Sequence, residues 1–234
     1  MNRVLHISIF RIWKERSTEL KRCSMTISKS APTFENENRL IDAGYLAIAG
    51  VDEVGRGPLC GPVTAAAVIL PVDAIPEGLN DSKKLSEKKR RVIYDHLMVH
   101  ADVSIAHATV EEIDEINILH ASMLAMERAV AGLKQVADFV LVDGNRIPKG
   151  LEGRAEAIVK GDAKSQSIAA ASIVAKVCRD DIMLSLAQQY PGYGWEKNAG
   201  YPTKAHMEAL QRLGVTPHHR RSFKPVHKML YQEI

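Results

Sequence analysis

Apolar residues along the chain form short runs that alternate with longer stretches of helical periodicity. Short apolar runs bounded by glycine, proline or acidic residues predict buried strands. Five such runs occur, at residues 45–51, 62–70, 103–110, 139–144 and 156–160. Because strands alternate with helices and no internal repeat appears, the pattern predicts an α/β layer structure.

The polar loop after residue 70 leads into the first strongly helical stretch, at residues 86–100. Ser86 can cap this helix, and Val92, Ile93 and Leu97 fall on one face. A second helix follows the third strand, where Thr109 and Glu112 have the spacing of a capping box. Its apolar stripe is expected in the core and consists of Leu119, Met123, Met126, Val130 and Leu133.

Two further helices are expected toward the C-terminus. Residues 167–190 are strongly helical and carry an Ala/Ser face suited to close packing. After an interruption rich in glycine, proline and aromatic residues, a helix from about Thr203 to Leu213 ends at Gly214. Residues from about 190 onward therefore form a small helical segment attached to the sheet.

Residues 1–32 differ from the rest and are interpreted as a basic appendage. Residues 1–30 hold seven Lys or Arg against Glu15 and Glu19, without the continuous apolar centre of a secretory signal. A targeting peptide is one alternative, and a translation start at Met25 is another. Residues 33–234 are expected to form the functional domain.

The composition limits the kinds of protein that the chain can be but does not identify its function. The chain has 234 residues, 46% of them hydrophobic, which suffices for a sizeable core. No apolar run approaches the roughly 20 residues of a membrane helix, so we expect no membrane association. Cys23, Cys60 and Cys178 are odd in number and far apart, which favours a reducing compartment such as the cytoplasm. A net charge of +3 permits a polyanionic partner without indicating one.

Four acids stand at the ends of three separate predicted strands. Asp52 and Glu53 end the first strand, and Gly55 and Gly57 after it could bend the backbone and aim both side chains at one region. Asp143 ends the fourth strand, although Asp-Gly also favours a hairpin turn. Asp162 follows the fifth strand, although it could instead cap the helix that begins near Ser165. Sites in α/β proteins form at strand ends, which favours convergence.

Four converging carboxylates would repel one another unless a divalent cation bound between them. Oxygen-only ligation suits Mg²⁺ or Mn²⁺ better than zinc. Such clusters typically hold two cations roughly 4 Å apart and hydrolyse phosphodiesters. The pattern therefore predicts a two-metal site for phosphoryl chemistry.

Basic stretches supply a matching substrate, a nucleic-acid backbone. They are Lys83, Lys84, Lys88, Lys89, Arg90 and Arg91, and then Arg220, Arg221 and Lys224. The turn Gly55–Arg56–Gly57 can present backbone amides and Arg56 at close range. At least one of Tyr193, Trp195 and Tyr201 is expected to stack on a sugar or base. The adjacent His218 and His219 lack further ligands at suitable spacing, so no zinc site is expected.

From about Thr33 to the C-terminus the chain resembles bacterial ribonuclease HII. The resemblance rests on IAGVDEVGRGPLCGPVTAAAVILP, LNDSKKLS, LVDGN, KGDAKSQSIAAASIVAKVCRD and GYPTKAHMEALQRLGVTPHHRRSF. It implies an RNase H-like mixed sheet flanked by helices, with a C-terminal helical segment. Cys60 and Thr64 depart from the alanine and valine expected there.

The resemblance also implies roles for individual residues. Asp52, Glu53, Asp143 and Asp162 would be the catalytic metal ligands. Gly55, Arg56 and Gly57 would contact the ribose 2′-hydroxyl, which distinguishes RNA from DNA. Tyr201 would pack on the adjoining deoxyribose, and Lys83 and Lys84 would contact phosphates.

These features predict a monomeric endonuclease that cuts RNA in RNA/DNA hybrids and at single ribonucleotides in duplex DNA. Its uses would be ribonucleotide removal and primer removal during replication and repair. A sliding clamp is a further candidate partner that no residue identifies. Two alternatives remain: a sheet-based nuclease acting on DNA alone, such as a junction resolvase, and a hybrid-binding protein without activity.

Overall fold

The computed structural model describes residues 31–231. The predicted basic appendage at residues 1–32 lies almost wholly outside the described residues. That interpretation therefore stays a prediction.

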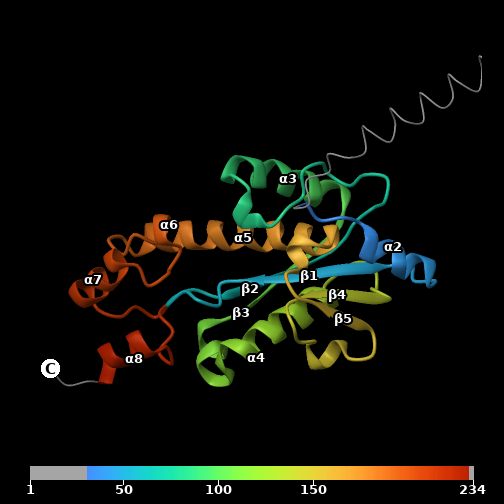
Figure 1. Cartoon of the computed structure of the whole chain (residues 1–234). Coiled ribbons are helices and arrows are strands. Elements are labelled where there is room, and N and C mark those ends of the chain that lie inside the picture. Colours follow the sequence, from blue (N-terminus) through green and yellow to red (C-terminus); the bar gives the residue numbers. More distant parts are fainter. Residues whose placement is uncertain (1–30, 232–234) are drawn as a thin grey trace, which may run out of the picture. The chain divides into compact units, whose positions relative to one another are not determined.

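A five-stranded mixed sheet forms the centre of the fold (Figure 1), with strand order β3-β2-β1-β4-β5. The strands are β1 (Ile48–Val54), β2 (Val63–Ile69), β3 (Asp102–Ala108), β4 (Phe139–Asp143) and β5 (Ala155–Ile158). Strand β2 runs antiparallel to both β1 and β3, whereas β4 pairs parallel with both β1 and β5. All five predicted strands exist, and the predicted α/β class with a mixed sheet is confirmed.

Helices surround the sheet. The longer ones are α2 (Glu35–Asp42), α3 (Glu87–His100), α4 (Val110–Ala131), α5 (Gln166–Gln189), α7 (Lys204–Leu213) and α8 (Lys224–Tyr231). Single turns are η1 (Ser82–Lys84), η2 (Lys149–Leu151), η3 (Gly161–Ala163) and α6 (Trp195–Asn198). None of the helices within residues 31–231 combines the length and apolar character needed to cross a bilayer.

The two faces of the sheet bury separate clusters of apolar side chains. Helix α4 covers the face that presents Val51 and Ala65. Helices α5 and α3 cover the other face, which presents Ala66 and Val68 (Figure 1). Gly50 lets α5 approach β1, because a Cβ at this position would collide with the backbone of Ser167.

The start of α5 is fixed by two polar side chains. Ser165 caps the helix by accepting a hydrogen bond from the Ile168 amide. The buried Glu37 accepts hydrogen bonds from Ser165 Oγ at 2.5 Å and from the Ser167 amide at 2.9 Å. These contacts fix the position of the helix that crosses the sheet beside β1.

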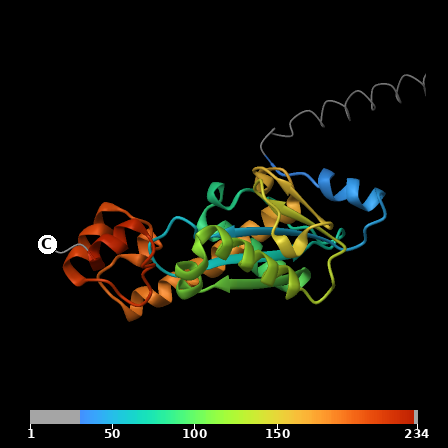
Figure 2. The same ribbon diagram turned by 90° about the horizontal axis from the view of Figure 1, so that it is seen from below.

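Elements after α5 pack around their own apolar cluster beyond the end of the sheet (Figure 2). Trp195 lies at its centre, only 1% exposed, and stacks on Tyr193 with ring centroids 4.9 Å apart. Leu59 and Cys60, from the segment between β1 and β2, complete the cluster. The C-terminal helices are thereby joined to the turn that leaves β1.

Most predicted helix boundaries agree with the structure. Ser86 caps α3, Thr109 and Glu112 form the predicted capping box, and Thr203 and Gly214 bound α7. The prediction for Val92 was wrong, because its side chain is 62% exposed.

Helix α4 departs from the expected regular helix. Asn117 takes a left-handed φ of 65° and breaks α4, and its Oδ1 accepts hydrogen bonds from the two amides that start the second part. Leu119 and Met123 of the predicted apolar stripe are only half-buried as a result, whereas Met126, Val130 and Leu133 lie in the core. The break turns the start of the second part toward the end of β4.

Candidate active site

Asp52 and Glu53 lie near the end of β1, as predicted, and the strand continues one residue further, to Val54. They pair with Ala66 and Ala65 of β2 and therefore point to opposite faces of the sheet. The chain does turn at Gly55, whose φ is +100°, but this turn follows both acids and is not what directs their side chains. Both side chains nevertheless border the same cavity. Strand β4 pairs with β1 only as far as Val51, so the last residues of β1 have no strand partner on the β4 side.

The other two acids come from the adjoining strand ends. Asp143 ends β4, and its Oδ1 accepts a hydrogen bond from the Gly161 amide at 2.6 Å. Its following strand is parallel, so Asp143-Gly144 is not a hairpin turn. Asp162 lies in η3, and Ser165 caps α5 in its place. Both alternative interpretations from the sequence are therefore excluded.

All four acids line one cavity of about 400 Å³. The turn Gly55–Arg56–Gly57, Lys83 and Tyr201 line it as well, together with Val54, Ser82, Ser172 and Lys176. Lys84, the remaining residue expected at the site, does not line this cavity. Residues separated by about 150 positions thus meet at the ends of β1 and β4.

The carboxyl groups perturb one another. Burial, followed by repulsion from Glu53 and Asp143, raises the pKa of Asp52 well above its ordinary value. Burial also raises the pKa of Glu53 to about 7, against the opposing effect of Arg56. The pKa of Asp162 is raised by burial and by the nearby Asp143 and Asp81. Bringing these acids together therefore costs free energy unless a cation compensates.

The protein supplies little compensating positive charge. Within residues 31–231, the ion pair that involves one of the four acids joins Glu53 Oε1 to Arg56 Nη1 at 3.3 Å. Lys176 is paired instead with Asp180, at 2.7 Å. An all-oxygen donor set with excess negative charge has the chemistry that Mg²⁺ and Mn²⁺ prefer.

The glycine turn lies against Tyr201. A Cβ built on Gly57 would lie 3.1 Å from Cε1 of the Tyr201 ring, so only glycine lets the ring approach this closely. The Tyr201 side chain remains 43% exposed. It is therefore the aromatic residue available to a ligand, whereas Tyr193 and Trp195 are buried core residues.

Several residues of the predicted basic stretches are placed elsewhere. Arg220 is completely buried and bonds to backbone carbonyls, so its expected role on a nucleic-acid backbone is wrong. Arg91 forms a bidentate ion pair with Asp181. Arg90 donates to the carbonyls of Ser82 and Leu85 and so supports η1.

Sequence spacing did not reveal a cluster of Cys60, His206 and His219, whose potential ligand atoms lie within 4.8 Å of one another. The hydrogen bonds argue against a metal there. The Thr216 amide donates to His219 Nδ1, which places the His219 proton on Nε2 and makes that atom a donor to His206. Both histidines already have hydrogen-bond partners at each ring nitrogen, which include Trp195, Tyr201 and Thr216.

Three polar residues of the cavity were missed by sequence reasoning. Ser172 and Lys176 lie one turn apart on α5, and Ser82 begins η1. The Ser82 and Ser172 hydroxyls are hydrogen-bonded at 3.0 Å, and a hydrogen bond from Ser172 lowers the pKa of Asp52. The signal available was polar residues at helical spacing within an otherwise apolar Ala/Ser stretch.

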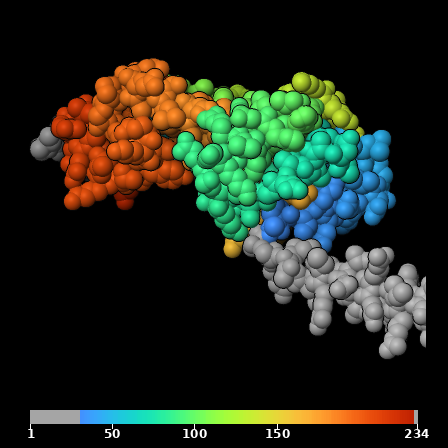
Figure 3. Space-filling model, turned by 90° about the horizontal axis from the view of Figure 1, so that it is seen from above, coloured from blue at the N-terminus to red at the C-terminus, as the bar shows by residue number. Residues whose placement is uncertain are grey.

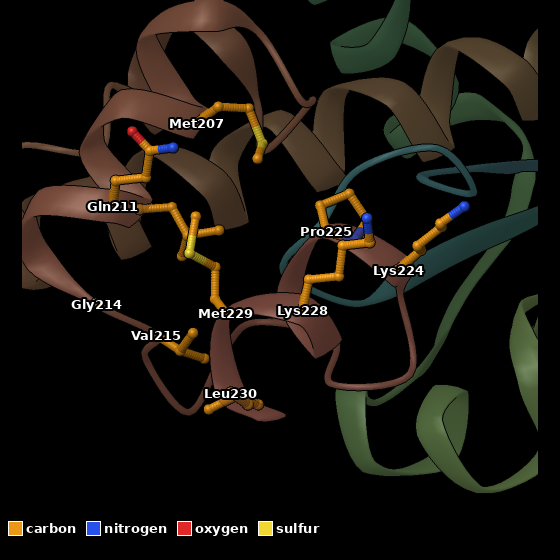
Figure 4. Close-up of a pocket in the computed structure, with 10 residues that line it drawn as sticks. Met207, Gln211, Gly214, Val215, Lys224, Pro225, Lys228, Met229 and Leu230 are labelled. Atoms are coloured by element: carbon orange, nitrogen blue, oxygen red, sulfur yellow. The ribbon is translucent and has the colours of Figure 1, made fainter. Parts of the chain in front are cut away.

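A larger cavity, of about 780 Å³, lies between α7 and α8 (Figure 4). Its lining includes Met207, Leu210 and Met229 but no carboxylate. Lys224, expected to contact nucleic acid, lines this cavity rather than the acidic one. The larger cavity is therefore not the candidate active site. Figure 3 shows the side of the molecule on which α3 and the C-terminal elements are exposed.

Comparison with known proteins decides the family. The family model described as Ribonuclease HII matches residues 49–226, which include all four acids, the glycine turn and Tyr201. The chain belongs to the ribonuclease HII family. It is thus a metal-dependent endoribonuclease that cleaves the RNA strand of RNA/DNA hybrids.

Relatives of ribonuclease HII type match nearly the whole chain. The Ribonuclease HII of Ruegeria pomeroyi is 64% identical over 211 residues, 90% of this chain and 90% of the relative. The crystal structure of ribonuclease H2 from Pyrococcus horikoshii OT3 is 30% identical with a TM-score of 0.66, covering 79% of this chain and 97% of the other. The structure of Bst-RNase HIII in complex with Mn²⁺ shares the fold, with 19% identity, a TM-score of 0.65 and coverage of 80% and 70%.

Proposed function

We propose that this ribonuclease HII cuts duplex DNA at single embedded ribonucleotides as well as RNA/DNA hybrids, using two divalent cations, Mn²⁺ or Mg²⁺. The observation that carries the proposal is the cavity in which Asp52, Glu53, Asp143 and Asp162 meet the glycine turn and Tyr201. The products would have 5′-phosphate and 3′-hydroxyl ends.

The four carboxylates would hold the cations. The raised pKa values of Asp52, Glu53 and Asp162 support this, because cation binding would favour the charged forms that burial disfavours. Bound divalent ions would supply activation of the attacking water and stabilisation of the leaving oxygen. The Gly161 amide fixes Asp143, so this ligand would need little reorganisation on binding.

Other cavity residues would select the substrate. Gly55, Arg56 and Gly57 would contact the 2′-hydroxyl, and Tyr201 would pack against the next deoxyribose. Lys83 lies on the same cavity and would bind a phosphate, with Lys84 beside it as a second phosphate contact outside the cavity. Lys176 is a further cation on this cavity, held at one end by Asp180.

Metal-dependent cutting of a DNA duplex with one ribonucleotide, compared with its all-DNA twin, tests the proposal. We expect cleavage of the first duplex alone, at the ribonucleotide, and only with Mn²⁺ or Mg²⁺. Equal cleavage of both would favour a DNA nuclease such as a junction resolvase. Hybrid binding with no cleavage under any metal would favour a binding protein.

The proposed setting is ribonucleotide removal from DNA and primer removal during replication and repair. We expect a monomer that acts in the cytoplasm. The expected monomer rests on the family, and the expected compartment rests on the family and on the free cysteines Cys60 and Cys178.

A further inference from the structure

Arg220 forms an unusual set of hydrogen bonds beneath the glycine turn. Its side chain is completely buried. Its guanidinium donates to four backbone carbonyls of the segment that leaves β1, at 2.6–3.2 Å: those of Gly55, Arg56, Pro58 and Gly61. One side chain from near the C-terminus therefore fixes both ends of the turn that carries Arg56.

Arg179 of α5 forms a second set of hydrogen bonds to the segment that follows the glycine turn. It is also completely buried, and it donates to the carbonyls of Pro62, Cys60 and Ala199 at 3.0–3.1 Å. Ala199 lies two residues before Tyr201. Arg179 thus links the chain after the glycine turn to the segment that presents Tyr201.

Both arginines use main-chain carbonyls where buried cations usually have acidic partners. Within residues 31–231, neither forms an ion pair with a carboxylate. Gly55 is part of the same packing, because its φ is +100° and a Cβ there would collide with Arg179 Nε. Burial of two arginines without acidic partners costs free energy, and their hydrogen bonds to the main chain restrict the glycine turn to one conformation.

We propose that Arg220 and Arg179 are positioning residues that set the register of Gly55–Arg56–Gly57 and Tyr201 against the four acids, and so determine selectivity for a single ribonucleotide. This inference rests on the proposed function. A hybrid offers a 2′-hydroxyl at every position of its RNA strand, whereas an embedded ribonucleotide offers one. A misplaced turn should therefore impair cleavage of the embedded ribonucleotide most.

The test uses Arg220→Lys in the full chain, which keeps the charge and loses the planar fork. The rate of cutting is measured on a duplex with one ribonucleotide and on a continuous RNA/DNA hybrid. The ratio of the two rates is independent of how much of the variant is folded, since the same folded molecules cut both substrates. We expect the ratio to fall by about tenfold to hundredfold, the usual cost of misplacing a contact by roughly 1 Å.

Arg154→Lys is the matched control, because Arg154 Nη1 also donates to a backbone carbonyl, that of Ala137, at the starts of β4 and β5 and so at the opposite end of β4 from Asp143. Its ratio should equal that of the parent chain. Mn²⁺ binding measured by calorimetry should be unchanged in Arg220→Lys, because the acids stay in place. In a double-mutant cycle, Arg56→Ala with Arg220→Lys should lower the ratio no further than Arg56→Ala alone.

An unchanged ratio in Arg220→Lys, or full additivity with Arg56→Ala, would overturn the inference. These outcomes are distinct from failure of the proposed function. If the parent chain cut no ribonucleotide-containing duplex, the proposed function itself would fall.

Discussion

The guanidinium of Arg56 lies 3.3 Å from the carboxylate of Glu53, three residues earlier in the chain. The pair joins a residue expected to bind metal to one expected to select the substrate. Among the ion pairs within residues 31–231, it is the one that includes an acid of the cluster, and the nearby Lys83 also favours the charged form of Asp162.

Glu53 makes the metal-free protein less stable at high pH. Burial raises the pKa of this carboxyl from 4.5 to about 7. Above this folded-state pKa the buried carboxylate is charged and lowers the free energy of unfolding. This loss of stability disappears as the pH falls through the folded-state pKa and the group is protonated. Glu53→Gln should therefore stabilise the chelator-treated protein at about pH 8, by up to about 3 kcal/mol, and much less at about pH 5. Urea unfolding of both proteins at the two pH values measures this, and a pH-independent difference would contradict it.

Asp52→Asn and Asp143→Asn should each abolish cleavage while hybrid binding survives. Asparagine keeps an oxygen that can accept the Gly161 hydrogen bond at position 143, so the loss is one of charge rather than of structure. Cleavage assays with Mn²⁺ and fluorescence anisotropy with labelled hybrid separate the two effects. Substantial cleavage by either variant would count against its place among the ligands.

Gly57→Ala should impair substrate selection with little loss of stability. The new Cβ would lie 3.1 Å from the Tyr201 ring, and the ring can move because it is 43% exposed. We expect cleavage at a single ribonucleotide to fall about tenfold or more, as for other small misplacements of a binding group. Thermal unfolding should remain near that of the parent. Parent-like cleavage would separate Tyr201 from selection.

Glu37→Ala should destabilise the fold by about 1–3 kcal/mol. The substitution removes the acceptor for Ser165 Oγ and the Ser167 amide at the start of α5. Glu37→Gln is the matched control, since it retains an oxygen acceptor and should lose less. Equal destabilisation by the two variants in urea unfolding would show that the acceptor is not what matters.

The sheet and the acid cluster could be predicted because each depends on a local pattern. Five apolar runs identified five strands, and an acid at the end of each of three runs identified the cavity. The pattern could not place the end of β1, because Asp52 and Glu53 continue the strand while breaking its apolar composition.

The supporting residues depend on long-range contacts and gave no such signal. Arg220 stands in a basic stretch whose pattern indicates contact with nucleic acid, because arginine is rarely buried without a partner. Its partners are carbonyls more than 150 residues away in sequence. His206 and Cys60 likewise come together only through the packing of α6 and α7 on the segment after β1.

Anomalous diffraction from crystals of the chain grown with Mn²⁺ and a non-cleavable ribonucleotide-containing duplex tests the central claim most directly. We expect manganese peaks between Asp52, Glu53, Asp143 and Asp162, next to the phosphate that follows the ribonucleotide. Absence of peaks at these carboxylates, or a peak at Cys60, His206 and His219 instead, would contradict it.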